Sequence, residues 1–184
     1  MSILAETSAA PIISAGTWSV DPVWSSLEFE VRKIGLIPIK GRVPGFVGTI
    51  EGGEHASIEG TVDAASITTF DETRDAHLQS PDFFDTQRYP VLRFESTNVS
   101  FEDGELVVRG DLTIKATTKS VELRGAFLGS GTDPYGNERI GIELEGTVDR
   151  AEFGLNWNAP LPLGGFLLPD DVTLRATFAA VRTA

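Results

Sequence analysis

Residues 91–114 read VLRFESTNVSFEDGELVVRGDLTI, and this stretch decides the fold. Apolar and polar side chains alternate on both halves of it, which is the period of a β-strand with one face in water. Between the halves stands Asp103-Gly104, a dipeptide suited to the type I′ turn of a two-residue hairpin. We therefore predict two antiparallel strands joined by a tight turn. Their inward side chains are Leu92, Phe94, Leu106, Val108, Leu112 and Ile114.

The same alternation recurs in both directions along the chain. No βαβ rhythm interrupts it, and one polar face per strand is typical of antiparallel sheets. Eight such strands form either a sandwich or a closed barrel, and we favour the barrel because closure removes unpaired edges. The fold class is thus all-β, with an eight-stranded antiparallel barrel. The six further strands are expected at about 26–32, 41–51, 56–67, 121–127, 140–148 and 172–178.

Alternation stops over residues 71–85, between the third and fourth strands. Asp71 is suited to cap a helix, and Pro81 to follow its end. We therefore predict a short helical segment that closes one end of the barrel. Its apolar side chains would face the core, and its polar side chains would lie near the rim. The polar cluster comprises Arg74, Asp75 and His77.

Length and composition indicate one domain over residues 17–184 after a flexible tail over residues 1–16. The net charge of −12 repels phosphate backbones and anionic lipid surfaces, which makes nucleic acid an unsuitable partner. No apolar run is long enough for a transmembrane helix. The first basic residue is Arg32, and Glu6 interrupts any apolar leader, so we expect a cytoplasmic protein without a signal peptide.

Several spaced motifs resemble one known family. They are Arg74-Asp-Ala-His77-Leu78, Ser80-Pro-Asp82-Phe83-Phe84-Asp85, Tyr89-Pro90, Phe94-Glu-Ser96, Asp21-Pro22 with Ser25 and Phe29, Gly110-Asp-Leu112-Thr113-Ile114-Lys115, and Arg150-Ala-Glu-Phe153-Gly154-Leu155. Together these motifs resemble the YceI-like family of polyisoprenoid-binding proteins, and the resemblance covers roughly residues 16–181. It implies a lipocalin-like barrel that is usually dimeric, has a tunnel for an isoprenoid chain or a fatty amphiphile, and has no established enzymatic activity.

Two motifs depart from the pattern of that family. Trp24 stands where relatives often have a histidine, and Ala116-Thr117 replaces a commoner glycine followed by an apolar residue. Many relatives also carry an export signal, which this sequence does not show.

Strand parity predicts the lining of the barrel, with Trp24 or Trp157 near one end. Glycines at 60, 110, 125 and 146 share the inward faces, where they permit bends, relieve crowding or leave room for a ligand. An interior of this kind would be mostly apolar with few polar anchors. The predicted lining residues are Phe29, Val31, Ile58, Val62, Phe94, Val108, Leu112, Leu123, Phe127, Ile142, Leu144, Leu174 and Phe178.

Residues 155–169 are unusually apolar for a connection between strands. Such a segment can form a lid over the barrel mouth, a dimer contact, or a loop packed on its own barrel. The residues expected to make these contacts are Trp157, Leu161, Phe166 and Leu167.

The sequence offers little for catalysis or metal binding. It has two histidines, no cysteine and no Gly-x-Ser-x-Gly motif, so we expect no metal, no cofactor and no catalytic residue. Arg74 and His77 suit either a ligand head group or internal hydrogen bonds. We predict a homodimeric carrier of a polyisoprenoid, a quinone-like tail or a fatty amphiphile. The alternatives are an isomerase or cyclase acting inside the barrel, and a ligand-free interaction module.

Overall fold

The computed structural model describes residues 13–184. Strands and one α-helix make up most of this part, with two short 3₁₀ helices labelled η. The elements in chain order are β1 Gly16–Val20, β2 Ser26–Lys33, β3 Ile37–Arg42, β4 Phe46–Gly52, β5 Ser57–Asp63, η1 Ala64–Ser66, α1 Glu72–Gln79, β6 Val91–Glu102, β7 Glu105–Ile114, β8 Thr117–Thr132, β9 Glu138–Asp149, η2 Arg150–Phe153 and β10 Asp171–Arg182.

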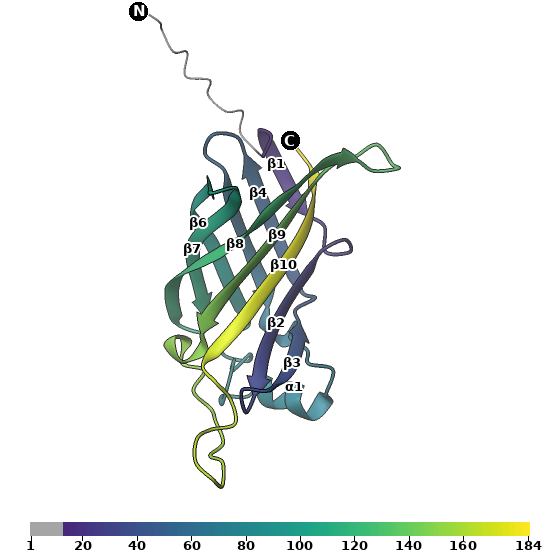
Figure 1. Cartoon of the computed structure of the whole chain (residues 1–184). Helices are drawn as coiled ribbons and strands as arrows, with labels where there is room; N and C mark the ends of the chain where they lie inside the picture. Colours follow the sequence, from purple (N-terminus) through teal and green to yellow (C-terminus); the bar gives the residue numbers. More distant parts are fainter. Residues whose placement is uncertain (1–12) are drawn as a thin grey trace, which may run out of the picture.

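An antiparallel barrel of eight strands forms within the described residues (Figure 1). Its strand order is β1-β4-β5-β6-β7-β8-β9-β10, and pairing of β1 with β10 closes the ring. The first half of β10, Thr173 to Thr177, pairs instead with β2, which carries β3 on its other side. The expected all-β barrel is therefore confirmed, with β1 and β2 sharing one edge of β10.

Two details of the predicted strands were wrong. The stretch 41–51 is not one strand, because Pro44 lacks an N–H and separates β3 from β4. Strand β1 was missed, because five residues carry too little alternation to predict a strand. Ile13 is buried and Gly16 begins β1, so residues 13–16 pack on the barrel. The rest of the predicted tail, residues 1–12, lies outside the described part.

The predicted hairpin and helix are both present. Asp103 and Gly104 have φ angles of 51° and 84°, as a type I′ turn requires, and they join β6 to β7. Asp71 caps α1 by accepting a hydrogen bond from the N–H of Arg74 at 2.9 Å. The helix ends at Gln79, so it covers only the first part of the predicted segment 71–85, and turns at 81–84 and 86–88 follow it.

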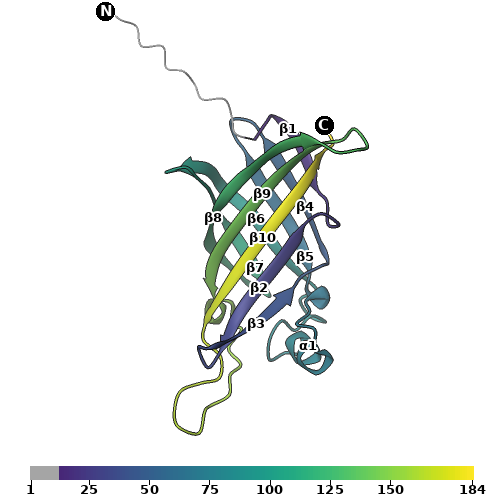
Figure 2. The ribbon, with the colours of Figure 1, turned by 45° about the vertical axis from the view of Figure 1, so that its right-hand side comes forward.

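The two ends of the barrel differ. The C-terminus and β1 lie at one end, whereas α1, the turn between β2 and β3, and residues 154–170 lie at the other (Figures 1 and 2). The main packed core lies towards the first end and includes Trp18, Ile50 and Ile140. No helix in residues 13–184 is both long and apolar enough to span a bilayer.

Candidate ligand cavity

The end of the barrel that carries α1 encloses a cavity of about 760 Å³. Side chains of β2 to β10, of the helical segment and of residues 150–168 form its wall. Most of the strand residues among them point inward, because alternate residues of a strand point to one face. This volume lies within the range of cavities that bind small molecules and cofactors. Ten of the residues predicted from strand parity line it, namely Phe29, Val31, Ile58, Val62, Phe94, Leu112, Leu123, Leu144, Leu174 and Phe178.

Three predicted lining residues belong to the packed core and not to the cavity wall. Val108 and Ile142 are fully buried, and Phe127 packs against their cluster. Parity predicted their face correctly, because they do point inward. It could not predict their height along the barrel axis, and at that height neighbouring side chains fill the interior. Trp24, which was predicted near one end of the lining, lies outside the barrel and is 53% exposed. The centre of its ring is 4.0 Å from the guanidinium carbon of Arg139.

Glycines beside the cavity make room for large inward side chains. A Cβ on Gly110 would lie 2.5 Å from the ring of Phe94, and one on Gly146 would lie 2.6 Å from the side chain of Leu123. Gly41 of β3 likewise lies under the ring of Phe29. Of the roles considered for strand glycines, relief of crowding is therefore the one visible at positions 110 and 146.

The first turn of α1 ties the helix to the barrel through Asp75. Its carboxylate accepts hydrogen bonds from the hydroxyls of Thr68 and Thr69 and from the N–H of Thr69, at 2.6–2.7 Å. Burial acts to raise the pKa of Asp75, but these hydrogen bonds and the charge of Arg74 outweigh it and hold the pKa below its usual value. Asp75 does not line the cavity, and its contacts are those of a structural residue.

Arg74 and His77 do line the cavity, and both have partners within the protein. Arg74 donates to the hydroxyl and the carbonyl of Thr69 at 2.6 and 2.8 Å. The Nε2 atom of His77 lies 2.8 Å from a carboxylate oxygen of Asp82, and its ring meets Phe83 and Trp157 edge-on. The structure thus brings two of the three predicted polar residues to the cavity wall, where they also fix α1.

Residues 155–169 form a projecting loop that begins in the cavity wall. Trp157 and Leu167 line the cavity, whereas Leu161 and Phe166 do not. Pro160 pairs with Phe166, so the middle of the segment forms a narrow hairpin. This hairpin extends away from the barrel in Figure 1 and does not fold across its end.

Arg150 holds the base of this loop, although the sequence pattern did not identify it as a site residue. The buried guanidinium donates to the carbonyls of Leu155, Trp157 and Pro169 at 2.6–2.9 Å. The motif Arg150-Ala-Glu-Phe153 was visible in the sequence, but an arginine there could equally have faced water. Only the fold brings the three carbonyls to one guanidinium.

The buried polar side chains of the described residues are satisfied within the protein. In residues 13–184 every buried side-chain nitrogen or oxygen has a hydrogen-bond partner, and no group of three or more potential metal ligands occurs there. The cavity wall in residues 13–184 is therefore mostly apolar, and its polar residues Arg74, His77 and Arg150 have hydrogen-bond partners within the protein.

Comparison with known proteins supports the same architecture. Residues 18–180 match the YceI-like domain. A UPF0312 protein of Staphylococcus aureus strain N315 is 33% identical over 165 residues, which cover 87% of this chain and 94% of the relative. Protein YceI of Escherichia coli O157:H7 is 32% identical over 165 residues, covering 84% and 86%.

Solved structures agree on the fold. The YceI protein of Campylobacter jejuni has a TM-score of 0.67 at 26% identity and covers 79% of this chain and 86% of its own. A polyisoprenoid-binding domain from Saccharophagus degradans has a TM-score of 0.65 at 14% identity, covering 90% and 98%. At that identity the second likeness shows the fold alone. The matched domain spans most of the chain, and its curated relatives exceed 30% identity, so this protein belongs to the YceI-like family.

Proposed function

We propose that this protein binds a long apolar molecule, such as a polyisoprenoid, a quinone-like tail or a fatty amphiphile, inside the barrel. The observation that carries the proposal is the apolar cavity of about 760 Å³. Removing apolar ligand surface from water stabilises a complex by roughly 25 cal/mol per Å², so a long hydrocarbon chain needs few polar anchors. The structural neighbour described as polyisoprenoid-binding supports this class of ligand.

A carrier agrees with the site better than the two alternatives. Arg74 and His77, the candidate polar residues of an isomerase or cyclase, contact Thr69 and Asp82, so structural contacts already account for both. A ligand-free interaction module would have a filled interior. Within the proposal, the carrier has no catalytic residue and no cofactor, works as a homodimer and resides in the cytoplasm.

The first test is mass spectrometry of organic extracts from the purified protein. We expect a stoichiometric lipid, and we expect added long-chain isoprenoid at a hundredfold excess over Kd to raise Tm by about 5–10 °C. If the extracts contain no stoichiometric lipid and added isoprenoid does not raise Tm, the carrier proposal is overturned.

A cavity-filling variant makes the test specific. Val172 of β10 lines the cavity, and Thr177 on the same strand is exposed on the outer face. We expect Val172→Trp to remove most of the bound lipid and of the lipid-dependent rise in Tm, because the indole occupies the ligand's volume. Thr177→Trp should retain both the bound lipid and the lipid-dependent rise in Tm. Equal loading of the two variants would place the ligand outside this cavity.

A further inference from the structure

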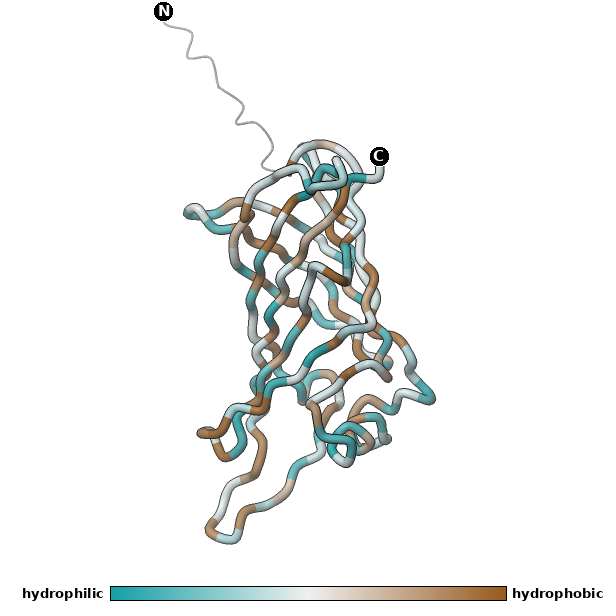
Figure 3. The backbone as a smooth tube through the Cα atoms, turned by 90° about the vertical axis from the view of Figure 1, so that its right-hand side faces the viewer, coloured by the Kyte–Doolittle hydropathy of each residue, from teal (hydrophilic) through white to brown (hydrophobic). Residues whose placement is uncertain are grey.

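Two exposed apolar tips project from the end of the barrel that holds the cavity. One is the turn between β2 and β3, where Leu36 is 69% exposed and Ile34 and Ile37 are also exposed. The other is the loop hairpin, where Leu163 is fully exposed and Phe166 is 64% exposed. Brown segments mark both projections in Figure 3. The N–H of Ile34 donates to the carbonyl of Leu167 at 2.8 Å, so the turn contacts the base of the loop hairpin.

Folding stability does not account for the apolar turn. Ile34 has a φ of 47°, in the left-handed region that a β-branched residue adopts only under strain. Ile34 is nevertheless 46% exposed, so burial offsets this strain only in part. Grouped apolar residues of this kind on a water-soluble surface mark a contact with another phase or partner.

The charge around the turn is opposite to that of the whole protein. Residues 32–42 contain four basic residues and no acidic one, and residues 155–169 contain no charge, although the net charge is −12. In the described part, Arg32 and Arg42 pair with Glu30 and Glu28 at 3.3 and 3.6 Å, whereas Lys33 and Lys40 make no ion pair. Glu30 also pairs with Arg175, so its charge is compensated twice.

This local reversal modifies the repulsion of anionic lipid expected from the net charge. At physiological ionic strength, charges separated by more than about 8 Å are largely screened. A surface that meets the turn therefore senses the basic residues of the turn first. The acidic residues of the same end, such as Asp71, Glu72 and Asp170, lie on other elements. Apolar tips flanked by lysine and arginine are typical of segments that lie in the membrane interface.

The tips are continuous with the cavity. Lys33 and Ile39, on either side of the first tip, line the cavity, as does Leu167 at the base of the second. A bilayer that receives both tips would therefore face this end of the barrel, and a hydrocarbon chain would travel between two apolar environments.

We infer that the tips at residues 33–37 and 161–167 insert into the surface of a phospholipid bilayer that contains anionic lipid. Insertion orients the cavity towards the acyl chains. The role of this docking in ligand uptake rests on the proposed function, whereas the docking itself is measured without any ligand.

The chain has no cysteine, so single cysteines can report insertion. Leu36→Cys and Leu163→Cys, labelled with an environment-sensitive NBD fluorophore, are mixed with vesicles of phosphatidylcholine and phosphatidylglycerol. We expect a blue shift and increased emission at both positions. Tyr135→Cys is the control, because Tyr135 is equally exposed but lies in the turn between β8 and β9 near the opposite end. A response from Tyr135, or none from the tips, would overturn the proposal.

Vesicle sedimentation of unlabelled variants separates the apolar and the electrostatic parts. Leu36→Asp should lower the partition coefficient at least about tenfold, because a carboxylate must then enter the interface. Lys40→Gln should lower it about fivefold with anionic vesicles and leave it unchanged with neutral ones. Tyr135→Asp should leave the partition coefficient unchanged with both anionic and neutral vesicles.

Ile34→Asn distinguishes docking from a loss of folding. Asparagine tolerates the left-handed conformation, so we expect Tm to rise by about 2–4 °C while vesicle binding weakens. A parallel fall of both would indicate a structural role for the turn.

The competing occupant of these tips is a second copy of the chain. If they form a dimer contact, light scattering would show a dimer that Leu36→Asp converts to a monomer, and the wild type would not bind vesicles. Such a result would replace the bilayer by a partner subunit. Lipid in the organic extracts with no vesicle binding would retain the proposed function and reject the docking.

Discussion

Gly110 of β7 shows how one residue shapes the interior. Its missing side chain admits the ring of Phe94, and a Cβ there would lie 2.5 Å from that ring and 2.6 Å from the carbonyl oxygen of Glu95. We expect Gly110→Ala to lower the free energy of unfolding by about 1–3 kcal/mol, because the backbone and the ring must both move. The urea midpoint measures this change.

Gly131 of β8 is the matched control for that substitution. A Cβ on Gly131 meets nothing within 4 Å, and this residue has no positive φ. Gly131→Ala should leave the midpoint unchanged or raise it slightly, because alanine loses less backbone entropy on folding. Equal effects of the two substitutions would show that strand propensity, and not the packing of Phe94, explains the glycine.

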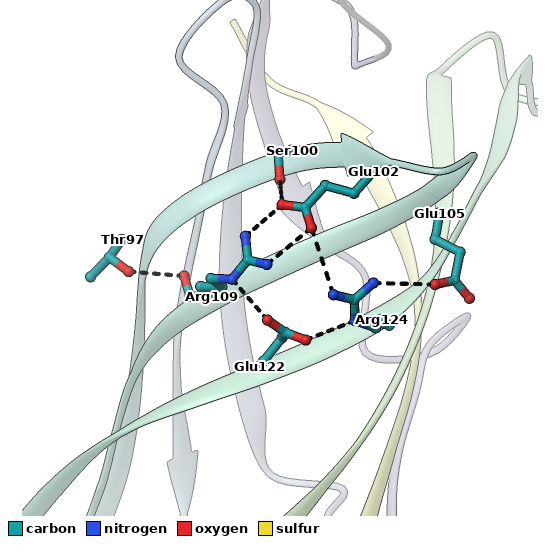
Figure 4. Close-up of polar contacts among 7 residues, drawn as sticks. All are labelled: Thr97, Ser100, Glu102, Glu105, Arg109, Glu122 and Arg124. Atoms are coloured by element: carbon teal, nitrogen blue, oxygen red, sulfur yellow. Dashed lines mark hydrogen bonds and ion pairs between the residues drawn. The ribbon is translucent and has the colours of Figure 1, made fainter.

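At the scale of elements, an ion network joins the outer faces of β6, β7 and β8 (Figure 4). Arg109 donates to both carboxylate oxygens of Glu102 at 2.6 and 3.0 Å and to Glu122 at 2.8 Å, while Arg124 contacts Glu122 at 2.7 Å. The hydrogen bonds from Arg109 are the main reason that the pKa of Glu102 falls from 4.5 to about 2. A carboxyl group whose pKa is lower in the folded protein than in the unfolded chain stabilises the fold at pH values above its unfolded pKa.

This pKa predicts how stability depends on acid. The contribution of Glu102 is complete above pH 4.5 and is lost as the pH falls towards 2. Arg109→Gln should raise the pKa of Glu102 towards 4.5, so the urea midpoints of variant and wild type should differ above pH 5 and converge near pH 2. Lys119→Gln removes the same charge from β8 and should give a difference that does not vary with pH. A pH-independent effect of Arg109→Gln would contradict the network.

The whole molecule is a barrel with one packed half and one hollow half. Leu106, Val108 and Ile142 are fully buried in the packed half, whereas β2 and β3 border the cavity and carry exposed side chains. Regions with fewer buried contacts open at lower free energy. We therefore expect hydrogen exchange to be slowest in the middle of β7 and β9 and fastest, among the strands, in β3.

Adding ligand should change this exchange pattern on one side only. A lipid in the cavity would slow exchange in β2, α1 and residues 155–169 and leave the packed half unchanged. Mass spectrometry of deuterated peptides measures both halves in one experiment. Uniform protection along the chain would mean that the ligand stabilises the fold without occupying the hollow half.

The sequence by itself determined the local features of this protein. Alternation predicted most strands and their inward faces, Asp103-Gly104 predicted a hairpin, and Asp71 predicted the start of α1. These features depend on the backbone geometry of a few consecutive residues, so the local residue types are sufficient.

Tertiary structure alone decided where the barrel closes and where it is hollow. The barrel closes where β1 pairs with β10, which brings Trp18 opposite Arg182. The position of the loop over residues 155–169 depends on Arg150, whose guanidinium donates to the carbonyl of Pro169, 19 residues further along the chain. Val108 and Leu112 share a strand face, yet only Leu112 borders the cavity. Such differences arise from contacts between residues far apart in the chain, and strand parity carries no information about those contacts.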